Sequence, residues 1–153
     1  MQGKRRTGTA PTLPPATAQR YLLASTLRRR RGELGEALAA QLTPLWQRDQ
    51  ADSAETVGGV LETACMDLWA TLAFALEMDD PALLTDQVRW LTDLLRVRGY
   101  DPSTILPRLL DAMQHTCEAI DCLPETLVNV TAILRAGHAL LAELATATVG
   151  ESA

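Results

Sequence analysis

Four side chains that can ligate a metal ion fall on one predicted helix. Asp111, His115, Glu118 and Cys122 follow one another at spacings of four, three and four residues, which places them on one helical face. Imidazole, carboxylate and thiolate groups together suit zinc and related metals. The same spacing also describes an ordinary exposed polar face, and one helix alone rarely completes a coordination sphere. The pattern therefore leads us to predict no metal site.

The second histidine of the chain, His138, lies in the apolar stripe of a later predicted helix, in register with Leu134 and Leu141. A histidine there can ligate haem or another metallated ring, although more often it sits at the edge of a core with a hydrogen-bond partner. One alternative function is therefore a small-molecule sensor that binds a tetrapyrrole, cobalamin or another apolar ligand between helices. Its candidate ligand-binding residues are His138, Trp69 and Trp90.

A run of four arginines, Arg28, Arg29, Arg30 and Arg31, can contact nucleic-acid phosphates or anionic lipid. Residues 1–31 contain eight of the 14 basic residues and no acidic residue, so the remaining chain holds six basic and 19 acidic residues. Docking of this basic segment on the acidic body, or on a partner, explains the run equally well. A DNA-associated accessory protein is therefore a second alternative function.

Sequence motifs of catalysis are absent. The chain has no GxSxG, GxGxxG or HExxH pattern, so we predict a non-enzymatic protein. Its three cysteines include no CxxC pair, which favours a reducing, cytoplasmic compartment. No apolar run approaches the roughly 20 residues of a membrane-spanning helix. We therefore predict a soluble protein without a transmembrane segment.

The composition predicts an all-α fold, because aromatic residues make up only 4% of the chain and strand-like runs are missing. We expect a flexible basic tail over 1–16, one helical domain over 17–149 and a flexible end over 150–153. The first helical region, 17–46, is expected to break near Gly32 and Gly35 and to end or bend at Pro44. The four long helices are expected at 54–78, 80–98, 102–121 and 124–149. Such a set packs as a helical bundle or in a globin-like arrangement.

The helix expected over 80–98 has apolar residues on two sides. Its main stripe consists of Leu84, Val88, Leu91 and Leu95. A second apolar side consists of Leu83, Trp90, Leu94 and Val97. Beside it, acidic and basic residues alternate in the series Asp86, Arg89, Asp93 and Arg96, at spacings that suit a solvated helix face. We expect the second apolar side to bind a second copy of the chain or another protein, or to pack inside the bundle.

Several short motifs within 65–99 are shared with a known type of helical module. They are Cys65 and Asp67, Ala75 and Leu76, Asp80 to Leu83, Asp86, Val88 to Leu91, Leu94 and Leu95, and Arg98 and Gly99. This run resembles the helical module that precedes the cobalamin-binding Rossmann domain in bacterial cobalamin-dependent sensors and regulators. The resemblance covers these 35 residues closely and the flanking helices loosely.

The resemblance implies a bundle that covers a cofactor or senses a signal. In such proteins the corrin ring is held mainly by the Rossmann domain, whose DxHxxG motif supplies the lower histidine ligand. This chain has no DxHxxG motif. The resemblance therefore implies a stand-alone regulatory module that keeps the helical scaffold without the cofactor domain. Our leading prediction is a non-enzymatic regulatory or protein-interaction module.

Overall fold

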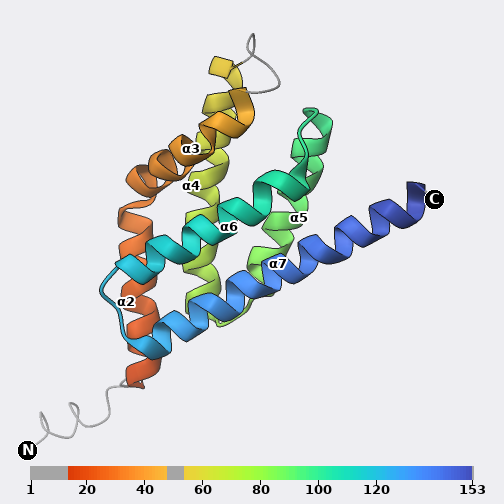
Figure 1. Ribbon diagram of the computed structural model, residues 1–153. Coiled ribbons are helices and arrows are strands. Elements are labelled where there is room, and N and C mark those ends of the chain that lie inside the picture. The colour runs from red at the N-terminus through yellow and green to blue at the C-terminus, as the bar shows by residue number, and fades with distance from the viewer. Residues whose placement is uncertain (1–13, 48–53, 153) are drawn as a thin grey trace, which may run out of the picture.

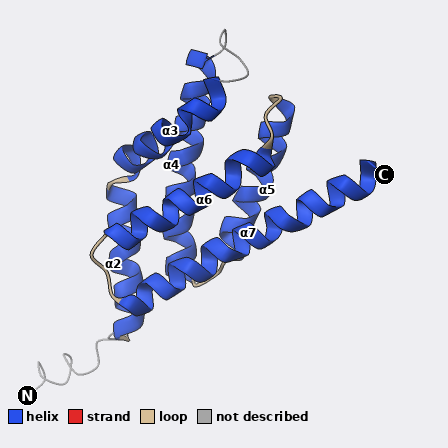
Figure 2. Cartoon of the chain, in the orientation of Figure 1, coloured by secondary structure: helices blue, strands red, loops and turns tan. Residues whose placement is uncertain are grey.

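The computed structural model describes residues 14–47 and 54–152, and within these ranges it contains six helices and no strand (Figures 1 and 2). The helices are α2 (Pro15–Arg29), α3 (Arg31–Gln47), α4 (Ala54–Met78), α5 (Ala82–Val97), α6 (Pro102–Ala119) and α7 (Pro124–Ser152). The predicted all-α bundle is confirmed. Residues 1–13 of the predicted tail lie outside the described ranges, and α2 already begins at Pro15.

The bundle has two layers. In Figure 1, α2, α4 and α5 run side by side, while α6 and α7 cross in front of them. The central helix is α4, which contacts α2, α3, α5 and α7. Its apolar residues on several sides explain this position, because each side meets a different neighbour. The fully buried side chains of α4 include Cys65, Leu68, Trp69, Leu72 and Leu76.

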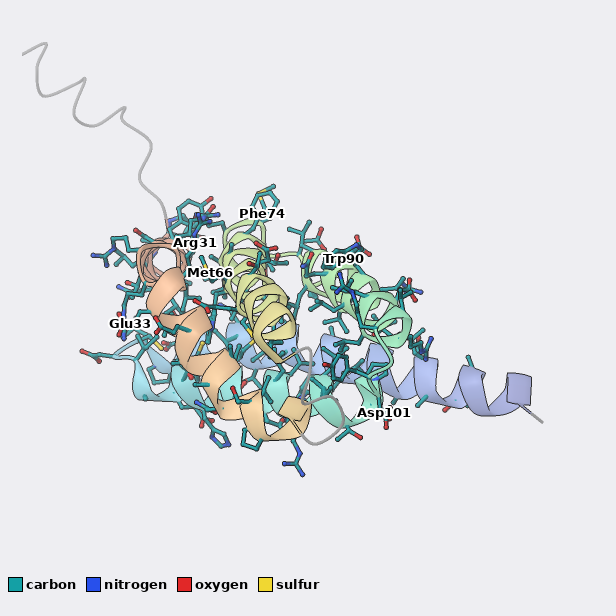
Figure 3. All side chains as sticks on the ribbon, turned by 90° about the horizontal axis from the view of Figure 1, so that it is seen from above. Arg31, Glu33, Met66, Phe74, Trp90 and Asp101 are labelled. Carbon is teal, nitrogen blue, oxygen red and sulfur yellow. The ribbon has the colours of Figure 1, made fainter. Side chains whose placement is uncertain are left out.

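The N-terminal helical region breaks at Arg30, between α2 and α3, within the arginine run and two residues before Gly32, near which the sequence predicts the break. Gly35 instead lies buried inside α3 against α4. A Cβ atom added to Gly35 would lie 3.0 Å from the backbone nitrogen and 3.1 Å from the Cα of Met66 (Figure 3). Gly35 thus permits a close approach of two helices. Pro44 lies within α3, so it does not end that helix.

Local signals set both ends of α5. The Asp80 carboxylate accepts a hydrogen bond from the backbone N–H of Ala82 at 3.0 Å, which satisfies one of the free donors of the first turn. After the last turn, Gly99 has a φ of 85°, the left-handed conformation predicted for it. These two turns fix which residues of α5 face the core.

The layer formed by α6 and α7 packs closely against α5 at Gly137 of α7. A Cβ atom at this position would lie 3.1 Å from Leu110 of α6, 3.6 Å from Leu84 and 3.7 Å from Val88 of α5. The sequence left open whether Gly137 is a weak point or a close helix contact, and it is a close contact. The helix α7 runs on to Ser152, three residues beyond its expected end, whereas α6 ends at Ala119, before Asp121.

The start of α6 gives a pH-dependent prediction. The Asp101 carboxylate accepts hydrogen bonds from the Ser103 hydroxyl (2.6 Å), the Ser103 N–H (3.0 Å) and the Thr104 hydroxyl (2.9 Å). These bonds, the one from the Ser103 hydroxyl above all, lower the pKa of Asp101 against a smaller opposing effect of partial burial. The stabilisation is therefore fully present above the unfolded-state pKa of about 3.9 and is lost as pH falls through the lower folded-state pKa.

We expect Asp101→Ala to lower the free energy of unfolding at neutral pH by about 0.5–2 kcal/mol, because the N-cap is lost. Asp101→Asn should keep most of the cap but lose its charge. Urea unfolding between pH 7 and pH 3 measures both effects. The difference between the wild type and Asp101→Asn should shrink below about pH 4, and a difference that stays constant down to pH 3 would contradict the assigned charge effect.

Candidate interaction surface

The outward side of α5 forms a continuous exposed surface, which we call the outer face of α5. It consists of Asp86, Arg89, Trp90, Asp93, Arg96 and Val97, all of them exposed. Trp90 is 52% exposed and Val97 is 84% exposed. The opposite side of the helix, with Leu84, Val88 and Leu91, is buried in the core. Because the core is already complete without Trp90 and Val97, these two apolar side chains are available to another molecule.

The four residues of the predicted second apolar side of α5 differ in burial. Leu83 and Leu94 are half-buried and pack against the edge of the core. Trp90 and Val97 face outward. The predicted set is therefore partly a packing element of this chain and partly a free surface. Periodicity alone could not separate the two halves, since both lie within a third of a turn on the helix.

Two further exposed apolar side chains lie on α4. Phe74 is 45% exposed and Met78 is 59% exposed, both near the end of α4. Figure 3 shows Phe74 and Trp90 on the same edge of the bundle, away from the layer of α6 and α7. These two α4 residues were not among the predicted contact residues. Their signal in the sequence was the large number of apolar positions on α4, more than one buried face requires.

Three of the four charged residues of the outer face have no ion-pair partner among the described residues. In the part of the chain that the structure describes, Asp86, Arg89 and Asp93 form no ion pair, although their spacing permits intrahelical pairs. The outer face of α5 therefore presents two carboxylates and two guanidinium groups around an exposed tryptophan. That composition, an aromatic residue with arginines nearby, is typical of protein interfaces.

The three candidate ligand-binding residues have different surroundings. Trp69 lies in the core and is only 1% exposed. Its indole Nε1 is the one buried side-chain polar atom in the described ranges that has no hydrogen-bond partner. Trp90 is on the outer face of α5. His138 lies at the edge of the core on α7, and its Nε2 is 3.1 Å from the Asp111 carboxylate of α6. His138 thus has a carboxylate at ion-pair distance at the edge of the core.

Two cavities were found near α5, and neither is lined by Trp69, Trp90 or His138. An apolar cavity of about 30 Å³ lies between α4, α5 and α6, which is room for one or two water molecules. A larger one of about 240 Å³ lies between α5, the start of α6 and α7, and its walls include Thr92, Arg96 and Leu141. Pockets for drug-sized ligands usually measure roughly 300–1,000 Å³, and a corrin or haem ring needs a pocket of that size. Both cavities are smaller than this.

The metal-ligand pattern on α6 does not assemble into a site. His115 contacts Glu118 at 3.3 Å, whereas Asp111 pairs with His138 of α7. Within residues 14–47 and 54–152, no three His, Cys, Asp or Glu side chains are grouped to hold a metal ion. Burial raises the pKa of Cys65 and of Cys117 to about 12, which keeps both thiols protonated at neutral pH. Both cysteines are thus core residues with little nucleophilic character.

The four arginines surround the junction of α2 and α3. Arg28 forms an ion pair with Glu77 of α4, and Arg30 forms one with Glu33 at 2.9 Å. Arg29 donates a hydrogen bond to the Thr26 hydroxyl. Arg31 is exposed, and it has no ion pair within the described ranges. The pair between Arg28 and Glu77 connects this basic segment to an acidic residue of α4.

One stretch of α7 is long and apolar enough to cross a membrane. Among the described residues it is Pro124–Ala147, with a mean hydropathy of 1.3 and 33% of its apolar window buried. The central helix of a soluble bundle meets the same criterion of length and composition. Val130, Ile133 and Leu134 of this stretch belong to the core. Their contacts give the apolar residues of α7 a packing role within the bundle.

Comparisons with known proteins do not assign the chain to a family. No family model matches the sequence, and neither the curated proteins nor the solved structures gave a match.

Proposed function

We propose that this protein is a non-enzymatic helical interaction module that binds a protein partner through the outer face of α5. The observation that carries the proposal is the exposure of Trp90, at 52%, and of Val97, at 84%, on a helix whose other side is fully packed. Tryptophan contributes strongly to binding when a partner buries it, because its large ring loses much apolar surface to water. The neighbouring charges suit the polar rim of such an interface.

A regulatory role in the cytoplasm completes the proposal. The regulatory part is supported by the resemblance of residues 65–99 to the helical modules of cobalamin-dependent sensors. The cytoplasmic part is supported by three cysteines that form no disulfide, two of which are buried. The proposal requires no bound cofactor.

Two substitutions at adjacent positions of α5 test the availability of Trp90. Trp90→Asp should leave the helical circular dichroism unchanged and shift the free energy of unfolding by less than about 1 kcal/mol, because an exposed residue contributes little to the fold. Leu91→Asp is the matched control, since it places the same charge at a position that is only 3% exposed. It should unfold the chain or cost several kcal/mol. If Trp90→Asp destabilises the chain as much as Leu91→Asp, Trp90 is a structural residue and the proposed surface does not exist.

A further inference from the structure

We infer that the partner of the outer face of α5 is a second copy of this chain, bound with the two α5 helices antiparallel. This inference rests on the proposed function and identifies the partner. It is carried by the order of the charges on α5, by the absence of ion pairs at Asp86, Arg89 and Asp93 within the described ranges, and by the position of Trp90 beside these charges. Each of these observations concerns residues that are exposed in the structure.

The charge order is complementary to itself only in the antiparallel direction. Along α5 the charged residues read Asp86, Arg89, Asp93 and Arg96. A parallel pair in register would place acid against acid and base against base. In an antiparallel pair about a two-fold axis beside Leu91, Asp86 lies opposite Arg96 of the second copy, and Arg89 lies opposite its Asp93. The two-fold symmetry repeats both pairs, so four oppositely charged pairs form.

The apolar residues fit the same register. Trp90 lies almost on the two-fold axis, so the two indole rings of a dimer meet at its centre. Val97 then comes level with Thr85 of the second copy, and Leu83, half-buried at the edge of the same face, lies two residues farther along that helix. An aromatic centre with a charged rim is the usual anatomy of a specific interface. Phe74 of α4 is also exposed, on the same edge of the bundle as Trp90 (Figure 3).

Electrostatics favours a second copy at this surface in particular. The chain carries a net charge of -5, so two copies repel each other when acidic surfaces approach. The outer face of α5 holds two acidic and two basic residues and is therefore neutral. Asp86, Arg89 and Asp93 have no ion pair in the described part of the chain, so a dimer need not break internal pairs of these three residues.

The expected contact is of modest size. The 16 residues of α5 span about 24 Å, and one helix face with part of α4 lies at the lower end of specific interface sizes. We therefore expect a reversible dimer whose population depends on protein concentration. Its charged pairs lie at the rim, so added salt should weaken it.

Charge reversal at one intermolecular pair provides the test. Arg89→Asp and Asp93→Arg each place like charges opposite each other twice in a homodimer. Each variant alone should raise the dimer dissociation constant at least about tenfold, and an equimolar mixture of the two should recover association, because opposite charges again face each other. Arg108→Asp, at an exposed position of α6, is the matched control for a reversed arginine charge and should dimerise like the wild type. Sedimentation equilibrium at low ionic strength measures these four samples and the wild type.

The outcomes separate this inference from the proposed function. Recovery in the mixture supports the antiparallel pair. A dimer that both reversals leave unchanged would overturn the assigned register. A wild type that stays monomeric would overturn the second copy as partner, and the outer face of α5 would then bind a different protein. The proposed function itself fails only if Trp90→Asp unfolds the chain.

Discussion

Replacing Trp69 by alanine is expected to lower the free energy of unfolding by about 3–5 kcal/mol, the usual cost of removing a large aromatic side chain from a core. Trp69 is 1% exposed on the central helix α4, so the cavity would open where several helices meet. A loss of this size is a large part of the 5–15 kcal/mol that stabilises a typical domain.

Trp69→Phe distinguishes the packing of the ring from the polarity of its nitrogen. The indole Nε1 is buried without a hydrogen-bond partner, which costs about 1–3 kcal/mol of desolvation free energy. Phenylalanine removes this polar group and keeps much of the apolar volume. Trp69→Phe should therefore cost far less than Trp69→Ala. Chemical denaturation of the two variants measures the difference, with Trp90→Ala as an exposed control, and equal losses for Phe and Ala at position 69 would contradict the assignment.

The second large effect concerns two glycines of α3, for which the same substitution should have opposite consequences. Gly35→Ala places a methyl group 3.0 Å from the backbone nitrogen of Met66 and closer still to its Cγ. Because a backbone cannot move aside as a flexible side chain does, we expect a loss of about 1–3 kcal/mol from overpacking. This exceeds the gain of up to about 1 kcal/mol that alanine brings to a helix.

Gly32→Ala is the matched control on the same helix. A Cβ atom there meets nothing within 4 Å, so only the gain in helix propensity remains. Gly32→Ala should thus stabilise the chain slightly, by at most about 1 kcal/mol, while Gly35→Ala destabilises it. Thermal unfolding of the two variants gives the signs directly. A stabilising Gly35→Ala would mean that α3 and α4 are farther apart than the structure places them.

The sequence predicted the elements with strong local signals. The bounds of α4 were predicted as 54–78 and observed as Ala54–Met78, and the left-handed turn at Gly99 was predicted from its position after the last turn of α5. The break in the N-terminal region was predicted near Gly32 and Gly35 and lies at Arg30, two residues before Gly32, but Gly35 itself is required by contact with Met66 of another helix. A tertiary reason of this kind leaves no mark on local propensity.

The candidate surface could be predicted only in part. Periodicity correctly indicated that α5 has apolar residues beyond its core stripe. It could not tell that Leu94 packs against the core while Trp90 does not, because that depends on where the neighbouring helices end. For the same reason the partner of His138 became clear only when α6 was placed beside α7, which brings Asp111 within 3.1 Å.

The most direct test of the outer face of α5 as an interface between two copies is the mass of the unmodified chain in solution over a series of concentrations, with Trp90→Asp measured alongside. We expect the mass of the wild type to rise from the 16.6 kDa of one chain toward twice that value, while Trp90→Asp stays folded at the mass of one chain. A wild type that remains at 16.6 kDa throughout the series, or a Trp90→Asp variant that associates equally well, would contradict it.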